Sequence, residues 1–157
     1  MLDALIADTL PEGGDRSSAV SDAAVVAWLE KHDAAGTHPD AAASPVRNYI
    51  TLCEGGASRH ETAVRNVAWM CREVAAGLYP ATALDTLEAV FRDGFTPDER
   101  RRSGRGSARE WWGILAWGIG QVTAEDIAKV RARNPIPAAD MVDPLANPAG
   151  KWGALWA

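Results

Sequence analysis

The most constraining feature of this chain is the recurrence of helix-starting signals without any strand pattern. A Ser or Thr followed three residues later by an acidic residue can form a capping box, in which each side chain bonds the backbone N–H of the other residue. No segment alternates apolar and polar residues in the way a half-buried strand does. The sequence therefore predicts an all-α fold, a compact bundle of about six helices. Four such pairs occur, the last of them the weakest: Ser58 with Glu61, Thr96 with Glu99, Ser107 with Glu110, and Thr123 with Asp126.

Glycine and proline divide the chain further, because glycine favours helix ends and proline the first helical turn. We expect three regions: residues 1–18 as a flexible N-terminal segment or linker, 19–135 as the helical bundle, and 136–157 as a Pro- and Gly-containing tail or linker. Besides the helices that the capping boxes open, helices are expected from Ser21 to near Gly36, from Ser44-Pro45 to Gly55-Gly56, and from Pro80 onward; the helix capped by Ser58 is expected to end at Gly77.

Charge limits the kind of partner. The 157 residues suit one domain, and the formal net charge of −5 excludes a protein that coats nucleic acid by bulk positive charge. The segment 100–109, RRRSGRGSAR, contains five arginines and no acidic residue. Any contact with a polyanion is therefore expected to be confined to a patch. The alternative is that these five arginines contact only solvent and bind no polyanion.

The same sequence argues against a metal centre, a secreted protein and a membrane span. Cys53 and Cys71 are the two cysteines, and with His60 they lack the paired spacing of a zinc site. The N-terminus has no basic segment before its short apolar run, and no window approaches the length of a spanning helix. We expect a reduced, cytoplasmic protein without a membrane partner.

The expected helix from Ser58 to Gly77 has two different faces. At 100° per residue its apolar side chains form one broad stripe, with His60 in the middle and Arg59 at the edge. Trp69 lies on the opposite, polar face, one turn after Arg65. Such a cation–aromatic pair can form a platform on which a nucleic-acid base stacks. The alternative is that a neighbouring helix covers Trp69.

The helix expected from Ser107 to Gln121 is apolar on all sides, which is typical of a helix surrounded by protein. Its tryptophans, Trp111, Trp112 and Trp117, are therefore expected to be core residues. Gly113 and Gly120 lie on one line, where another backbone could approach closely. This Trp-rich helix is expected at the centre of the bundle.

Enzymatic motifs are missing from the sequence: there is no phosphate-binding G-x-x-x-x-G-K-[ST], no G-x-G-x-x-G, no G-x-S-x-G and no H-E-x-x-H. An independent enzyme is not expected.

The stretches GGASRHETAVRNVAWMCREVAAGLYP and REWWGILAWGI resemble the helix-bundle region between the polymerase and helicase domains of phage and plasmid primase-polymerase replication proteins. The family's G-x-R-[HN] loop is matched by Gly56, Arg59 and His60, with one extra residue after the glycine.

This resemblance covers roughly residues 45–135. It implies a non-catalytic domain that helps an adjoining polymerase hold single-stranded template DNA, in some cases with a nucleotide such as ATP, while a primer begins. Its partners would be single-stranded DNA and the adjoining primase-polymerase and helicase domains, and no tightly bound cofactor is expected.

We therefore expect phosphates to meet the helix start and the arginine-rich segment, which its glycines would keep mobile, and a base to stack on Trp69 or Tyr79. One alternative is a protein-interaction module of a replication or regulatory protein. Another is a helix-turn-helix around GIGQVTAED, although Glu125 and Asp126 would repel phosphates there. The expected nucleic-acid-binding residues are Arg59, His60, Arg65, Trp69, Arg100, Arg101, Arg102, Arg105 and Arg109.

Arg59 and His60 raise a further question, because a helix N-terminus is positive and normally disfavours cations. One answer is that an anion such as phosphate binds there. The other is that Arg59 pairs with Glu61 or another carboxylate, while His60 packs as a neutral core residue.

Overall fold

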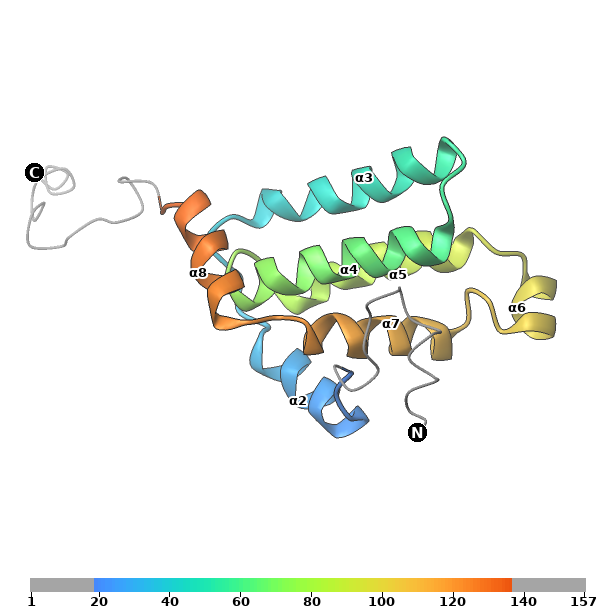
Figure 1. Cartoon of the computed structure of the whole chain (residues 1–157), viewed down its shortest axis with the longest axis horizontal. Helices are drawn as coiled ribbons and strands as arrows, with labels where there is room; N and C mark the ends of the chain where they lie inside the picture. The colour runs from blue at the N-terminus through green and yellow to red at the C-terminus, as the bar shows by residue number, and fades with distance from the viewer. Residues whose placement is uncertain (1–18, 137–157) are drawn as a thin grey trace, which may run out of the picture.

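The computed structural model describes residues 19–136, so the two expected terminal segments lie outside the described residues, apart from Ile136. Within this range the fold is all-α and has no strand, which confirms the predicted fold class. Figure 1 shows α3, α4 and α7 side by side, with α6 projecting beyond the end of the bundle. The elements in chain order are α2 (Asp22–Lys31), η3 (Pro39–Ala42), α3 (Ala43–Glu54), α4 (Arg59–Ala75), η4 (Ala81–Ala83), α5 (Leu84–Asp93), α6 (Pro97–Ser103), α7 (Ala108–Gly120) and α8 (Ala124–Arg133).

The capping residues fix where four of these helices begin. The side chains of Ser58, Thr96, Ser107 and Thr123 each accept a hydrogen bond from the backbone N–H three residues later. The reciprocal half of the box forms at Thr96 and Thr123. The Glu110 carboxylate instead bonds the N–H of Gly106 and the ring of His60. The weakest of the predicted boxes, at Thr123, is thus complete, whereas the one at Ser107 is only half formed.

Three predicted helix boundaries are wrong. The first helix ends at Lys31 rather than near Gly36. Ser44 is not a cap, because η3 continues directly into α3 and Ser44 already lies inside that helix. Pro80 precedes the short 3-10 turn η4, and α5 begins only at Leu84. In the last two cases a 3-10 turn leads into the α-helix, which a local capping pattern does not reveal.

Helices α4 and α7 together form the centre of the bundle. They pack against each other more extensively than any other pair, and α4 also contacts α3, α5 and α8. The close approach depends on Gly118, because a Cβ atom there would lie 2.9 Å from Cγ1 of Val67. Gly113, which was expected to allow such an approach, faces open space.

The tryptophans of α7 are less uniformly buried than expected. Trp111 is a core residue, whereas Trp112 and Trp117 are partly buried and pack against the core from its edge. Trp112 donates from Nε1 to Asp22 Oδ1 at 2.8 Å and so ties α7 to α2.

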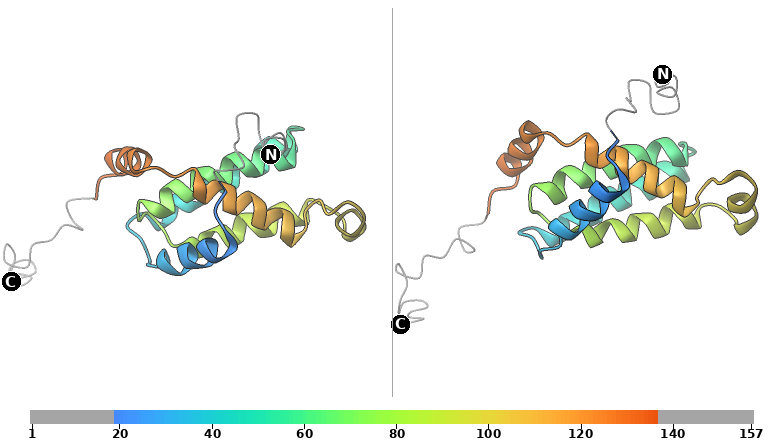
Figure 2. Two further views of the ribbon diagram at one scale, coloured as in Figure 1. Left: turned by 60° about the horizontal axis from the view of Figure 1, so that its bottom comes forward. Right: turned by 90° about the horizontal axis from the view of Figure 1, so that it is seen from below.

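An aromatic cluster closes the end of the core nearest α6. Phe91 of α5 is fully buried, with ring centroids at 5.4 Å from Phe95, 5.9 Å from Trp111 and 6.5 Å from Tyr49. Figure 2 shows that α6 lies beyond this end in both further views. The arginine-rich segment therefore begins where the core stops.

Candidate nucleic-acid interface

The structure separates the expected nucleic-acid-binding residues into two groups. Arg65 and Trp69 lie on the middle of α4, away from its N-terminus. The remaining members gather around the end of the bundle from which α6 projects, at the first turns of α4 and α7, along α6 and in the turn between α6 and α7: Arg59, His60, Arg100, Arg101, Arg102, Arg105 and Arg109.

Trp69 stands between two hollows on the surface of the bundle. The first has a volume of about 450 Å³ and lies where α4 meets α3 and α7. The second has a volume of about 480 Å³ and lies between α4 and α8. Trp69 and Arg72 line both, so we call the two hollows together the Trp69 groove. The first is lined by Asn48, Leu52, Val64, Arg65, Asn66, Ala68, Trp69, Arg72 and Trp117, and the second by Trp69, Arg72, Glu73, Val130, Arg133 and Asn134.

The Trp69 groove is positively charged. Within residues 19–136, its three arginines, Arg65, Arg72 and Arg133, form no ion pair. Its one carboxylate, on Glu73, accepts a hydrogen bond of 2.7 Å from the hydroxyl of Tyr79. An anionic ligand would therefore meet three available guanidinium groups and one engaged carboxylate.

Trp69 itself is not part of the core. Its side chain is partly buried, yet it does not belong to the apolar side chains that pack against the core cluster in the described part of the chain. The residue lines both hollows. The structure thus leaves Trp69 and Arg65 on an accessible surface, and it places Arg72, Arg133 and Trp117 around the same hollows. Arg72, one turn after Trp69, could have been found from helical spacing, whereas Arg133 and Trp117 enter only because α7 and α8 fold back against α4.

Tyr79 cannot stack a base, which corrects the sequence-based expectation. It is 2% exposed, and its hydroxyl is held by Glu73. Burial, with the hydrogen bond to Glu73 as a second cause, raises the pKa of Tyr79 above its usual range. The residue is a buried, neutral core member.

His60 faces a carboxylate of its own chain. Its Nδ1 lies 2.6 Å from Oε2 of Glu110, and the other oxygen of that carboxylate accepts the backbone N–H of Gly106. Glu110 therefore joins α4, α7 and the segment before α7 at one point. The ring is about one-third exposed, so it is not the fully packed core residue of the alternative expectation. Because Glu110 occupies Nδ1, a phosphate could meet the ring only at Nε2.

Arg59 packs against an aromatic ring instead of a carboxylate. Its guanidinium carbon lies 5.4 Å from the centroid of Phe95, and that of Arg105 lies at the same distance from the same ring. In residues 19–136 neither arginine forms an ion pair, so the alternative in which Arg59 pairs with Glu61 or another carboxylate is wrong. Gly94 leaves the room for Arg59, because a Cβ there would lie 2.7 Å from its Nε.

We expect Arg59→Ala to lower the free energy of unfolding by about 0.5 to 1 kcal/mol, because it removes the cation–π contact with Phe95. Relief of the positive charge at the α4 N-terminus offsets a few tenths of a kcal/mol of that loss. Urea denaturation measures the change, and titration with single-stranded DNA shows whether affinity falls with it. Reduced stability with intact affinity would make Arg59 purely structural.

The first part of the arginine-rich segment is helical, so the expectation of a mobile loop is wrong for residues 100–103. The Thr96 capping box starts α6, and Gly104, with φ of 77°, ends it. Arg101 and Arg102 both pair with Asp98, at 2.8 and 3.1 Å, and remain 72% and 78% exposed. These local contacts are worth little individually, but they favour the helix over a loop.

Arg100 makes different contacts from those of Arg101 and Arg102. Its Nη1 donates to the carbonyl oxygens of Arg92 at 2.8 Å and Phe95 at 2.6 Å, which closes the C-terminal end of α5. Its positive charge there also suits the negative end of the helix. Arg100 is therefore partly buried, whereas Arg101, Arg102, Arg105 and Arg109 are exposed.

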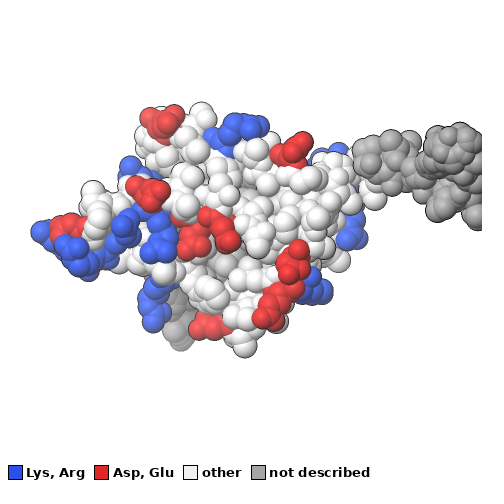
Figure 3. Space-filling view, turned by 180° about the vertical axis from the view of Figure 1, so that it is seen from behind, with Lys and Arg blue, Asp and Glu red and all other residues white. Residues whose placement is uncertain are grey.

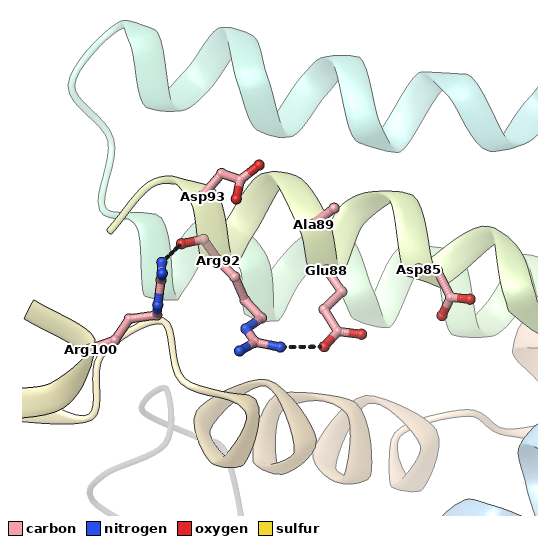
Figure 4. Close-up of a pocket in the computed structure, with 6 residues that line it drawn as sticks. All are labelled: Asp85, Glu88, Ala89, Arg92, Asp93 and Arg100. Atoms are coloured by element: carbon pink, nitrogen blue, oxygen red, sulfur yellow. Dashed lines mark hydrogen bonds and ion pairs between the residues drawn. The ribbon is translucent and has the colours of Figure 1, made fainter. Parts of the chain in front are cut away.

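The outer face of α5 has the opposite character. A hollow of about 350 Å³ is lined by three acidic residues and two arginines. In Figure 4 the side chain of Arg92 points toward Glu88, and that of Arg100 points toward the backbone of Arg92. The ion pair between Arg92 and Glu88 measures 3.4 Å. Figure 3 shows acidic side chains over the middle of this side and basic ones concentrated toward the α6 end. Phosphate would be repelled here. The lining residues are Asp85, Glu88, Ala89, Arg92, Asp93 and Arg100.

In the described part of the chain, no group of three or more His, Cys, Asp or Glu side chains could hold a metal ion. Cys53 and Cys71 are both free thiols. None of the helices in residues 19–136 combines the length and apolar character needed to cross a membrane.

No protein-family model, curated protein or solved structure matches this chain. The Trp69 groove and the exposed arginines of α6 are therefore the features from which a function can be inferred.

Proposed function

We propose that this chain is a helical domain that binds single-stranded DNA in the Trp69 groove. The observation that carries the proposal is the position of Trp69, whose partly exposed ring lies between arginines that have no carboxylate partner in residues 19–136. Base–aromatic stacking combined with a cationic track for the backbone is the usual basis of binding single strands without sequence preference.

The recessed position of Trp69 favours a single strand over a duplex. The ring lines hollows between helices and does not stand on a protruding surface. In a duplex the bases are stacked on one another, so only an unstacked base can enter such a hollow and lie against the ring. A duplex would meet the arginines alone.

The α6 arginines provide a second, purely electrostatic contact with the same strand. Arg101 and Arg102 are exposed on a helix that projects from the bundle (Figure 1). Their salt bridges with Asp98 are exposed and weak, so phosphate can replace that carboxylate at little cost.

We further propose that the domain serves a primase-polymerase, holding the template while the first primer nucleotides are joined. The support is the resemblance of the stretches around Arg59 and around Trp111 to the helix-bundle region of those replication proteins. A nucleotide such as ATP is the alternative ligand of the Trp69 groove, since it offers the same base and phosphates.

The salt dependence of binding tests the role of α6. For single strands, log K falls with log salt with a slope of about −0.7 per phosphate neutralised. Replacing Arg101 and Arg102 by Gln is therefore expected to reduce the slope for an oligo-dT by about 1.4. Arg100 is left in place because it closes α5.

The matched control is Lys31→Gln with Arg47→Gln, which removes two exposed charges outside both the groove and α6. Its slope should stay closer to that of the unmodified protein. Equal slopes in the Arg101/Arg102 variant and the unmodified protein would remove α6 from the interface.

The second candidate function is a protein-interaction module, which the acidic hollow on the outer face of α5 favours. A partner with a basic surface would complement Asp85, Glu88 and Asp93. Failure to bind single-stranded DNA even at low salt would favour this alternative over the proposal.

A further inference from the structure

The division of the Trp69 groove into two hollows carries a more specific inference, which rests on the proposed function. Trp69 and Arg72 are the two residues that line both hollows. The first hollow continues toward α3 and α7, and the second toward α8. Trp69 and Arg72 therefore lie at the boundary between the two hollows.

Each hollow is lined by one arginine of its own and by a second arginine that the two hollows share. Arg65 belongs to the first hollow alone, Arg72 to both, and Arg133 to the second alone. Arg65 and Arg72 are seven residues apart, roughly 10.5 Å along the helix axis. A nucleic-acid strand has the complementary order, in which each base lies between two phosphates.

We infer that the Trp69 groove holds two consecutive nucleotides, with Trp69 between their bases and Arg72 at the phosphate that joins them. Arg65 and Arg133 then meet the outer phosphates. An indole ring has two π faces, so one tryptophan can stack a base on each side.

Polar groups in the first hollow suit a base better than an apolar ligand. Asn48 Oδ1 accepts from Asn66 at 3.0 Å, which leaves the Asn48 amide group as a donor. Trp117 also lines this hollow; its indole N–H lies beneath the accessible surface and has no hydrogen-bond partner within residues 19–136. Because indole can only donate, a base carbonyl oxygen or ring nitrogen that reached this N–H would satisfy it.

The test compares thymidine 3′,5′-bisphosphate with the dinucleotide pdTpdTp, which carries a phosphate at each end, using the full chain at low salt. Affinities are obtained by NMR titration of the indole N–H signals. A second stacked base is expected to tighten binding about tenfold or more.

Arg133→Gln should reduce this dinucleotide advantage about fivefold or more, while affinity for the mononucleotide changes less than about threefold. The matched control is Lys129→Gln, which removes the same charge from α8 outside both hollows. The inference is wrong if the unmodified protein shows no dinucleotide advantage. It is also wrong if that advantage survives Arg133→Gln, or if it falls equally in the Lys129→Gln control.

Binding of a 20-residue oligo-dT separates this inference from the proposed function. Should Trp69→Ala weaken that binding while pdTpdTp shows no advantage, single-strand binding stands and the two-nucleotide site is wrong. Should the oligo-dT bind equally well to the unmodified protein and to Trp69→Ala, or to neither, the proposed function is wrong and this inference falls with it.

Discussion

Replacing Trp69 by alanine is expected to weaken the binding of single-stranded DNA by about 1 to 3 kcal/mol, or roughly 5- to 150-fold. The loss arises because the variant keeps Arg65 and Arg72 but has no ring on which a base can stack. Fluorescence anisotropy of a labelled oligo-dT measures the change. Since the arginines remain, the salt dependence of the residual binding should be close to that of the unmodified protein.

The same variant should remain folded, because Trp69 lies outside the side chains that pack on the core in residues 19–136. A core tryptophan would cost about 3 to 5 kcal/mol of stability on truncation. Trp69→Phe is the matched control, since it keeps an aromatic face and should recover most of the affinity. A collapsed melting temperature in Trp69→Ala, or affinity that does not change, would contradict the assignment of Trp69 as a platform.

Replacing Phe91 by alanine is expected to lower the free energy of unfolding by about 3 to 5 kcal/mol. Phe91 is fully buried and contacts the rings of Tyr49, Phe95 and Trp111, so its removal leaves a cavity where α3, α5 and α7 meet. A domain of this size is typically stable by about 5 to 15 kcal/mol, so the variant should be close to unfolding. Urea denaturation followed by circular dichroism measures the effect.

Thr86→Ala provides the comparison on the same helix, because Thr86 is exposed. A surface substitution of this kind should change stability by less than about 0.5 kcal/mol. If the two variants lose similar stability, the aromatic cluster does not hold this end of the bundle together.

Much of the fold could be predicted from local signals alone. Ser58, Thr96, Ser107 and Thr123 each cap a helix as expected, because an N-cap needs only a side-chain oxygen and a backbone N–H three residues away. The starts of α3 and α5 could not be predicted in the same way. Each continues from a 3-10 turn, and no capping side chain marks the transition.

The candidate site shows the same division between local and long-range information. Arg65, Trp69 and Arg72 share one side of α4, so helical spacing is enough to group them. Glu110 was predicted to cap its own helix, yet its carboxylate bonds His60, fifty residues earlier in the chain. Such a contact depends on how α4 and α7 pack, and no pattern within a single helix indicates it.

Arg100, Arg101 and Arg102 show that neighbours in sequence can differ in role. The run was expected to act as one charged loop, but Arg100 bonds the carbonyl oxygens at the end of α5, whereas the other two face solvent. The helical geometry of α6 causes this difference, because successive side chains point about 100° apart.

The projection of α6 from the bundle also has an evolutionary consequence. The segment from Thr96 to Arg105 starts and ends at the edge of the core, and α6 makes no extensive packing contact with another helix in the described part of the chain. Insertions, deletions and charge changes are tolerated best in segments of this kind. Selection can therefore lengthen, shorten or recharge α6, and so change the partner that this end of the molecule meets, while Phe91 and its neighbours stay the same.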